Sequence, residues 1–130
     1  MFSWPVRVYY EDTDAGGVVY YANYLKFFER ARTEWLRSFG LNQAKLVEEQ
    51  DLIFVVRSAM LDFIRPARLE DLLEVTVEPL KLARVYVELA QEVRCGAQVL
   101  ARAKIKVACL EQQHFKPVAI PQSLRESIQQ

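Results

Sequence analysis

The chain has 130 residues, a length typical of one domain rather than two, so we expect a single domain over residues 1–130. Hydrophobic residues make up 52% of the chain, a share that favours a packed core over disorder. Lys and Arg total 17, and so do Asp and Glu. This formal net charge of zero argues against nucleic acid as a partner, because such partners usually require a basic excess.

Cysteine and histidine are scarce. Two Cys and one His are too few for a disulfide framework or for Cys/His zinc spacings. Residues 1–5 lack the pattern that opens a signal peptide, and no apolar run approaches the roughly 20 residues that span a bilayer. We therefore expect a cytoplasmic protein that needs no metal and no other cofactor.

The first half of the chain predicts a strand, a polar loop and two helices. Residues 6–11 are rich in β-branched and aromatic residues and predict a short strand. Residues 12–17 form a loop by composition. Across residues 21–39, apolar side chains recur at three- and four-residue steps, which predicts a helix with one wide aromatic face. Gly40 suits a left-handed helix end, and residues 41–50 are expected to add a short second helix.

The second half reads as strands. Residues 52–64 are apolar on both faces and predict a central strand, which residues 65–68 interrupt. Apolar and polar residues then alternate over residues 73–78, 84–95 and 99–109. The apolar positions on both sides of Gly96 are odd-numbered, so we expect a three-residue loop with a glycine bulge there. Residues 123–130 predict a helical turn. This order predicts an α+β fold, a curled antiparallel sheet packed on one long helix.

Residues 9–24 bring together the parts that acyl transfer requires. The carboxylates Asp12 and Asp14 precede the pair Gly16-Gly17, and a helix start follows. A helix start presents unpaired amides that suit a developing oxyanion, and glycines let a ligand approach the backbone. A carboxylate beside them can act as base or nucleophile on an acyl carbon. The same residues also suit helix capping and turn formation, so the pattern alone leaves both interpretations open.

The stretch Tyr-Glu-Asp-Thr-Asp-Ala-Gly-Gly-Val-Val-Tyr at residues 10–20 resembles the signature of the 4-hydroxybenzoyl-CoA thioesterase family. More narrowly, it resembles the Tol-Pal-associated acyl-CoA thioesterase branch of that family. The similarity extends from residues 4–8 to residues 116–117 and includes residues 28–34, 54–57 and 66–69. The resemblance implies a hotdog fold, in which an antiparallel sheet wraps around one long central helix. It also implies a homodimer or tetramer with active sites at the dimer interface.

The resemblance further implies an enzyme that hydrolyses acyl-CoA thioesters to free acid and coenzyme A. The family pattern makes Asp14 the catalytic residue, as nucleophile or general base, and gives Asp12 a supporting role. The expected oxyanion and substrate-binding residues are Gly17, Val18, Val19, Tyr20 and Tyr21. Tyr21 stands where the Tol-Pal-associated branch usually has His. A contact through the Tyr21 amide survives this change, whereas an acid–base role of the His does not.

Charged residues elsewhere have less specific interpretations. Family members place basic residues for the coenzyme A phosphates near Lys81 and Arg84. Glu29 is expected to form a surface ion pair with Lys26 or Arg32, which lie at three-residue spacing. A second group of basic residues is expected to be a solvated strand face: Arg102, Lys104 and Lys106.

Two other functions are compatible with the resemblance. One is a hotdog enzyme that acts on substrates carried by an acyl carrier protein, although such dehydratases usually use a His that this loop lacks. The other is a non-catalytic or weakly active partner of Tol-Pal envelope proteins, held peripherally at the inner membrane. A thiol-release assay over acyl-CoA chain lengths separates these functions from hydrolysis.

Overall fold

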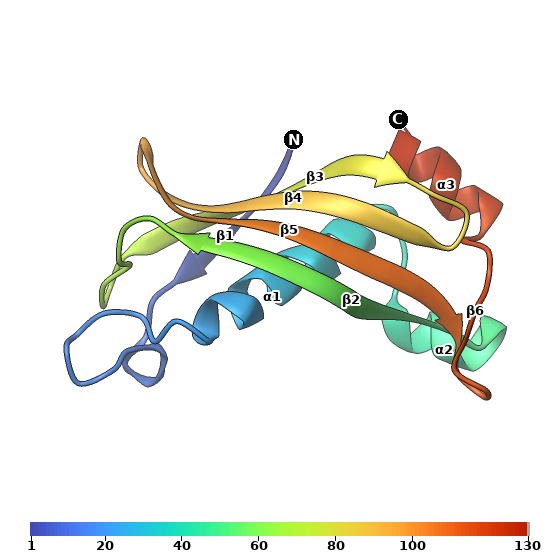
Figure 1. Cartoon of the computed structure of the whole chain (residues 1–130), viewed down its shortest axis with the longest axis horizontal. Coiled ribbons are helices and arrows are strands. Elements are labelled where there is room, and N and C mark those ends of the chain that lie inside the picture. Colours follow the sequence, from blue (N-terminus) through green and yellow to red (C-terminus); the bar gives the residue numbers. More distant parts are fainter. Residues whose placement is uncertain (130) are drawn as a thin grey trace.

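The computed structural model describes residues 1–129, and Figure 1 shows one antiparallel sheet curled around the long helix α1. The strands are β1 (Phe2–Arg7), β2 (Leu52–Phe63), β3 (Leu72–Leu82), β4 (Tyr86–Cys95), β5 (Gln98–Glu111) and β6 (Lys116–Pro117). The helices are α1 (Asn23–Arg37), α2 (Gln43–Gln50), α3 (Gln122–Gln129) and a 3-10 turn, η1 (Tyr10–Asp12). The α+β hotdog arrangement is therefore confirmed. Gln130, the last residue of the predicted C-terminal helical turn, lies outside the described residues.

The core lies between α1 and the concave face of the sheet. The strand order is β1-β3-β4-β5-β2, and β6 pairs with the end of β5. Phe27, Phe28 and Ala31 of α1 are fully buried, as the three- and four-residue spacing predicted. Sheet residues that pack into the same cluster include Leu73, Val75, Val93, Ala101 and Ile105. Burial of this aromatic face supplies the main driving force that holds the helix on the sheet.

One buried polar side chain fastens α1 to the sheet. Gln91 of β4 is only 1% exposed, and its Oε1 accepts a hydrogen bond from Arg32 Nη1 at 3.0 Å. Its Nε2 donates to the carbonyl oxygens of Phe28 at 3.1 Å and Thr76 at 3.2 Å. Burial lowers the pKa of Arg32, while the nearby charge of Glu29 raises it. Gln91 of β4 thus connects α1 to β3 through hydrogen bonds, which buried polar groups require.

The N-terminal strand begins earlier than predicted. It was expected at residues 6–11, but β1 covers Phe2–Arg7 and residues 10–12 form η1. The rings of Phe2 and Trp4 stack at 6.5 Å, and β1 pairs with β3 along its whole length. β1 lies at an edge of the sheet, which tolerates Pro5 because one side of an edge strand needs no amide donors.

The helical region matches the prediction closely. α1 starts at Asn23 rather than Tyr21, and Gly40 follows its end with a φ of +80°, the left-handed conformation expected there. The predicted short second helix is α2, whose start is capped by the Asn42 side chain through the Lys45 amide at 3.2 Å. None of the helices within residues 1–129 is long and apolar enough to cross a membrane.

The prediction that residues 52–64 form a central strand is wrong. β2 pairs only with β5 and forms an edge of the sheet. Residues 56–60 are all exposed, including the apolar side chains of Val56 and Met60. An irregularity at Arg57, between the pairs Val56↔Val107 and Ser58↔Lys106, also shifts the residues that face inward from even to odd positions. This shift makes the sequence of the strand apolar on both faces, although only one of its two edges pairs with another strand of the chain.

The β4–β5 connection differs from the prediction. The odd-numbered apolar residues on both sides of Gly96 share one face, but not because of a three-residue loop. The loop has two residues, Gly96 and Ala97, because Cys95 pairs with Gln98. Val93 pairs with Ala101 and Arg94 with Val99, so Leu100 is the extra residue of a bulge. The bulge keeps the odd-numbered apolar residues of both strands on one face, which the sequence required. The expectation of a three-residue loop was wrong, because the extra residue is Leu100 within β5 and not a third residue of the loop.

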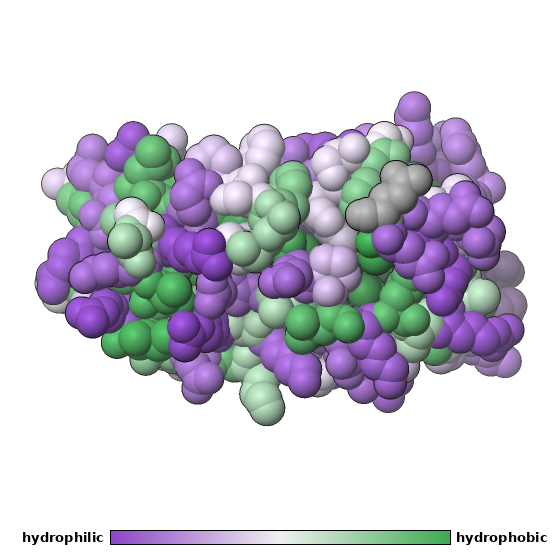
Figure 2. Space-filling model, turned by 90° about the horizontal axis from the view of Figure 1, so that it is seen from above, coloured by the Kyte–Doolittle hydropathy of each residue, from purple (hydrophilic) through white to green (hydrophobic). Residues whose placement is uncertain are grey.

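Exposed apolar side chains are not spread evenly. On the face seen in Figure 2, hydrophobic and hydrophilic side chains form small interspersed patches rather than one continuous apolar surface. Several of the exposed large apolar side chains gather in two regions, Val56, Met60 and Phe63 in β2, and Tyr9, Tyr10, Tyr20 and Tyr21 around the loop before α1. These two regions are therefore the ones whose exposure needs an explanation.

Replacement of Gln91 by Ala is expected to lower the free energy of unfolding by about 2–3 kcal/mol, because it leaves the half-buried Arg32 guanidinium and the buried Thr76 carbonyl without their partner. Urea unfolding followed by circular dichroism measures this change. Gln98→Ala, at an exposed position of the adjacent hairpin, serves as the control and should cost less than about 0.5 kcal/mol. Equal small effects of both changes would contradict the role given to Gln91.

Candidate functional site

The loop before α1 folds as a short hairpin that presents Asp14. Thr13 and Val19 form an isolated antiparallel bridge. The Asp14 amide donates to the Val18 carbonyl at 2.9 Å, and the Gly17 amide donates to the Asp14 carbonyl at 3.0 Å. Gly17 has a φ of +78°, a left-handed conformation that favours glycine. The Gly16-Gly17 pair thus makes the tight turn that its composition predicted.

The Asp14 carboxylate is exposed at the tip of this hairpin. Its Oδ1 accepts a hydrogen bond from the Gly16 amide at 2.8 Å. A side chain at position 16 would bring a Cβ within 3.2 Å of that oxygen, so glycine leaves the carboxylate room. The second oxygen of Asp14 accepts no hydrogen bond from residues 1–129, which leaves it available to a ligand.

Asp12 is the buried carboxylate of the loop, and it holds the loop backbone by hydrogen bonds. Its Oδ2 accepts a hydrogen bond from the Tyr9 amide at 2.8 Å. Its carbonyl accepts from the Tyr20 amide at 3.0 Å and from Asn23 Nδ2 at 2.8 Å. Neither Asp12 nor Asp14 caps α1, whose N-cap residue is Ala22. Neither carboxylate therefore caps the long helix. The capping and turn interpretation is correct for the loop itself, because Asp12 caps η1 through the Tyr9 amide and Asp14 accepts from the Gly16 amide within the turn.

The peptide unit of Ala67 ties the loop to the rest of the fold. Its carbonyl accepts from the Val19 amide at 2.8 Å, and its amide donates to the Tyr24 hydroxyl at 3.0 Å. Ala67 is fully buried, and Tyr24 packs its ring against Phe63 with 5.4 Å between centroids. The role of Ala67 was not among the features predicted from the sequence. The available signal was Tyr24, a tyrosine on the buried helix face whose hydroxyl required a partner.

Two backbone amides near Asp14 remain free among the residues predicted to bind the substrate. The amides of Gly17, Val19 and Tyr20 already donate to backbone carbonyls. Those of Val18 and Tyr21 donate to no acceptor in the part of the chain that the structure describes. The amides of Asn23, Tyr24 and Leu25 close the first helical turns. The free amides thus lie just before the helix rather than in its first turn.

Aromatic side chains form one wall beside these amides. The rings of Tyr20 and Tyr21 lie 4.9 Å apart, and the Tyr21 ring meets the edge of Phe63 at 6.1 Å. All three side chains are exposed. A hydrogen bond with the Tyr21 hydroxyl raises the pKa of Tyr20. This wall is aromatic and carries the two phenol hydroxyls of Tyr20 and Tyr21.

Lys81 and Arg84 lie at the other end of the protomer. They belong to the β3–β4 turn region, on the right of Figure 1, whereas the loop before α1 lies on the left. The eleven residues of β3 separate the two ends by about 33 Å at the usual rise per residue. The Lys81 ammonium lies 5.7 Å from the centre of the Tyr86 ring, and its interaction with the Tyr86 hydroxyl raises the pKa of Lys81. Within one protomer, these cations cannot reach Asp14.

The second basic group behaves as a solvated strand face, as predicted. Arg102 Nε donates to Glu92 at 2.9 Å, and Lys106 lies 3.8 Å from Glu88. Lys104 is exposed and forms no ion pair within residues 1–129. The partners lie on the neighbouring strand β4, so the cations are largely neutralised within the sheet.

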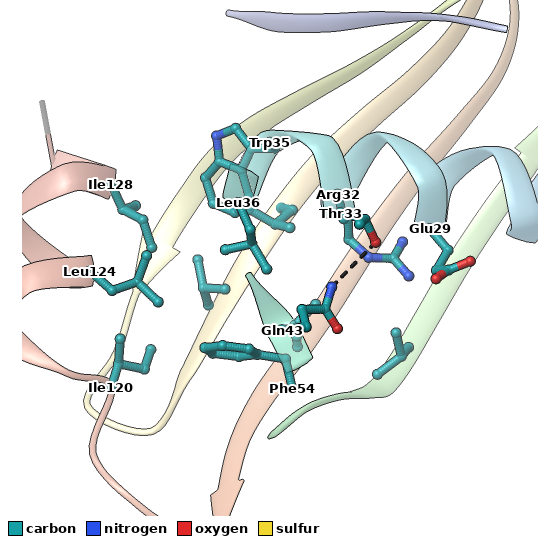
Figure 3. A pocket seen from close by; sticks show the side chains of 14 residues that line it. Glu29, Arg32, Thr33, Trp35, Leu36, Gln43, Phe54, Ile120, Leu124 and Ile128 are labelled. Atoms are coloured by element: carbon teal, nitrogen blue, oxygen red, sulfur yellow. Dashed lines mark hydrogen bonds between the residues drawn. The ribbon is translucent and has the colours of Figure 1, made fainter. Parts of the chain in front are cut away.

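A cavity of about 150 Å³ lies beneath the second half of α1 (Figure 3). Glu29, Arg32, Thr33 and Gln43 supply its polar groups, and Gln43 Nε2 donates to Thr33 Oγ1 at 3.2 Å. Its remaining walls are apolar: Trp35, Leu36, Phe54, Val56, Val87, Leu89, Val107, Ile120, Leu124 and Ile128. Glu29 forms no ion pair within residues 1–129, so the predicted pairing with Lys26 or Arg32 is wrong. No pattern in the sequence predicted this cavity.

Within residues 1–129, no three His, Cys, Asp or Glu side chains lie together as the ligands of a metal ion would.

Comparison with known proteins identifies the class of enzyme. Residues 8–128 match the family model of the thioesterase-like superfamily. The chain is 48% identical to the acyl-CoA thioesterase YbgC of Haemophilus influenzae, over 95% of this chain and 91% of that protein. It is 40% identical to YbgC of Helicobacter pylori, over 92% of this chain and 94% of that protein.

Solved structures agree with this assignment. A probable thioesterase from Bartonella henselae superposes with a TM-score of 0.88 at 38% identity, covering 92% of this chain and 98% of that one. A 1,4-dihydroxy-2-naphthoyl-CoA thioesterase from Synechocystis superposes with a TM-score of 0.90 at 29% identity, covering 98% and 94%. The chain belongs to the thioesterase-like superfamily, and the predicted enzyme class, a thioester hydrolase, is confirmed.

The two aspartates of the loop should differ in what they contribute to stability. Asp12→Ala leaves the Tyr9 amide without its buried acceptor and is expected to cost about 1–3 kcal/mol of unfolding free energy. Asp14→Ala removes only an exposed bond and should change stability by less than about 1 kcal/mol. Thermal and urea unfolding of both variants measures the difference. A larger loss for Asp14→Ala would reverse the roles given to the two carboxylates.

Proposed function

We propose that this enzyme hydrolyses acyl-CoA thioesters to a free acid and coenzyme A, with Asp14 as its catalytic residue. One observation carries the proposal. One oxygen of the Asp14 carboxylate accepts no hydrogen bond from residues 1–129, and the nearby amides of Val18 and Tyr21 donate to no acceptor in those residues. A carboxylate and free amides on one short, fastened loop are what acyl transfer requires. The acyl-CoA relatives support coenzyme A as the carrier.

Two routes are available to the carboxylate. In one, an Asp14 oxygen attacks the thioester carbonyl carbon, the C–S bond breaks, and water then hydrolyses the mixed anhydride. In the other, Asp14 takes a proton from a water that attacks the same carbon. In both routes the carbonyl oxygen gains negative charge, which the free Tyr21 amide, and that of Val18, would stabilise. The thiolate leaves readily, so neither route needs a strong acid at the sulfur.

We further propose that the active unit is a homodimer formed through β2. This edge strand exposes Val56 and Met60 and carries no unbroken row of charges that would protect its edge. Its charged residues, Arg57 and Asp62, form no ion pair within residues 1–129. Two antiparallel copies of β2, centred between Ala59 and Met60, bring each Arg57 beside the partner's Asp62. This self-complementary charge pattern favours a second copy as the occupant.

The dimer also gives a role to the cations at the β3–β4 turn. In the sheet, Val55 of β2 and Tyr86 of β4 both pair with Ala108 of β5, so the turn lies at the Val55 end of β2. Antiparallel pairing brings the partner's Asp14 loop to that same end. We propose that Lys81 and Arg84 bind coenzyme A phosphates of a substrate whose thioester lies at the partner's Asp14.

The family resemblance also predicts protein partners and a location. The predicted partners are an acyl carrier protein or Tol-Pal envelope proteins, and the predicted location is a peripheral one at the inner membrane.

Replacement of Asp14 by Asn should lower kcat for acyl-CoA hydrolysis by at least about a hundred-fold, because the amide is neither a base nor a nucleophile at neutral pH. A thiol-release assay over acyl-CoA substrates measures the loss. Glu11→Gln changes an exposed acid of the same loop and serves as the control, with kcat expected to stay unchanged. Near-normal turnover of Asp14→Asn with an intact fold would refute the assignment.

Replacement of Met60 by Lys should dissociate the dimer, because it places a charge at the centre of the proposed β2 interface. Light scattering coupled to size-exclusion chromatography measures the mass. Leu80→Lys, at a similarly exposed apolar position of β3, is the matched control and should leave the dimer intact. A monomeric wild-type chain, or dissociation by the control alone, would contradict an interface at β2.

A further inference from the structure

The segment that follows β2 runs beside the Asp14 hairpin and carries an arginine there. Val18 and Arg68 form an isolated antiparallel bridge, and next to it the Val19 amide donates to the Ala67 carbonyl at 2.8 Å. The loop before α1 and the connection from β2 to β3 accordingly lie at the same end of the molecule, on the left of Figure 1. Neither hydrolysis by Asp14 nor the β2 dimer, as proposed above, uses Arg68.

Three residues, Asp14, Val18 and Arg68, lie side by side across neighbouring segments and are called the Asp14 row below. The Asp14 amide donates to the Val18 carbonyl at 2.9 Å, which places these two residues opposite each other in the hairpin. The bridge then places Val18 opposite Arg68. Opposed residues of an antiparallel pair point to the same face, and the buried Val19 points to the other. The Arg68 side chain therefore shares an outward face with the catalytic carboxylate.

The backbone of Arg68 is fixed, whereas its guanidinium is free. Its amide donates to Asp71 Oδ2 at 2.9 Å, and its carbonyl accepts from the Asp71 amide at 3.1 Å. The turn that these bonds close is held by Val8, whose amide donates to the Asp71 carbonyl at 2.9 Å. The Arg68 side chain is exposed and forms no ion pair within residues 1–129. Since a guanidinium has only donors, it is available to an acceptor on a ligand.

The spacing of the Asp14 row decides which part of a thioester Arg68 can meet. Opposed residues of antiparallel segments lie about 4.5–5.5 Å apart between Cα atoms, so Asp14 and Arg68 are separated by about 10 Å. Their side chains form no ion pair with each other. A ligand group that contacts Arg68 therefore lies several bonds away from a carbonyl carbon that is attacked at Asp14.

Coenzyme A carries one acceptor at such a separation from its thioester. Two methylene groups and an amide nitrogen connect the sulfur to the first amide carbonyl of the pantetheine arm. The phosphates lie much farther along the arm, where Lys81 and Arg84 are proposed to bind them. A simple fatty acyl group offers no acceptor beyond the thioester carbonyl itself. The first pantetheine carbonyl is thus the acceptor that suits a free guanidinium, and a charged donor makes a strong hydrogen bond to it.

We propose that Arg68 is a substrate-binding residue that donates to the first pantetheine amide carbonyl of a coenzyme A thioester held at the Asp14 of the same protomer. The proposal rests on the proposed thioesterase function and extends it to recognition of the carrier. The amide does not change during hydrolysis, so this bond is equally strong in the bound substrate and in the transition state. It therefore lowers KM and leaves kcat unchanged.

Three thioesters of one acyl group test the proposal, the acyl group being the one whose coenzyme A thioester the wild type hydrolyses fastest. The second thioester, of N-acetylcysteamine, keeps the first amide carbonyl and lacks the rest of the arm. The third, of ethanethiol, lacks the amide. Arg68→Ala should lower kcat/KM at least about ten-fold for the first two and less than about two-fold for the third. With the coenzyme A thioester, the loss should lie in KM.

Arg65→Ala is the matched control. Arg65 is an exposed arginine of the same segment that forms no ion pair within residues 1–129, and it lies outside the Asp14 row. Its replacement should change kcat/KM by less than about two-fold for all three thioesters. Arg68→Lys keeps a cationic donor in a different geometry and should restore part of the activity that Arg68→Ala loses.

The pattern of losses distinguishes the proposal from its alternatives. Equal losses with all three thioesters would overturn it, because Arg68 would then act on the thioester itself or on the fold. A loss confined to the coenzyme A thioester would also overturn it, since Arg68 would then bind the arm beyond its first amide. Unchanged values for all three would leave Arg68 without a role. A wild-type enzyme that hydrolyses no thioester would instead refute the proposed function.

Thermal melting and light scattering separate substrate binding from stability and assembly. Because the Arg68 side chain has no ion-pair partner within residues 1–129, Arg68→Ala should melt and assemble as the wild type does. If Arg68→Ala does not fold, Arg68→Met replaces it, because Met keeps an apolar stem without the donors. A folded variant of lower mass would assign Arg68 to the subunit interface and would overturn the proposal.

Discussion

The arrangement of the site depends on one buried peptide, that of Ala67. Its carbonyl and its amide are both used, by the Val19 amide on one side and the Tyr24 hydroxyl on the other. A buried backbone group without a partner is costly, so the loop, the first turn of α1 and the segment after β2 must be placed together. The exposed Asp14 hairpin gains its fixed position from these buried bonds. An exposed catalytic side chain on a loop needs such support from a rigid scaffold.

A second constraint comes from the edge strand β2. Its side chains Val56 and Met60 are exposed, and its outer backbone groups have no strand of the described chain beside them. A protein with such an edge normally protects it with charges or prolines, or pairs it with another strand. β1, at the opposite edge, contains Pro5, whereas β2 contains none. The asymmetry between the two edges is the physical reason to expect a second copy at β2 and not at β1.

The sequence was sufficient for features that are set locally. The spacing of Phe27, Phe28 and Ala31 predicted the buried face of α1, and the composition around Asp14 predicted a carboxylate loop with a glycine turn. The family resemblance supplied the fold and the enzyme class. Features set by pairing between distant segments were missed. The bulge at Leu100 and the irregularity at Arg57 each change which residues share a face, and neither position has a distinctive residue type. The edge position of β2 and the cavity beneath α1 depend on packing that periodicity does not encode.

The exposure of Asp14 in one protomer has a consequence for catalysis. In water, a carboxylate and two amides interact weakly with a developing charge, because the high dielectric constant screens them. The same groups act strongly only where solvent is excluded. In this chain, the hairpin and the aromatic wall of Tyr20, Tyr21 and Phe63 are both open to solvent at the same strand edge. Pairing of two such edges would cover both at once, so assembly, rather than folding of the single chain, is the step that turns these residues into a working site.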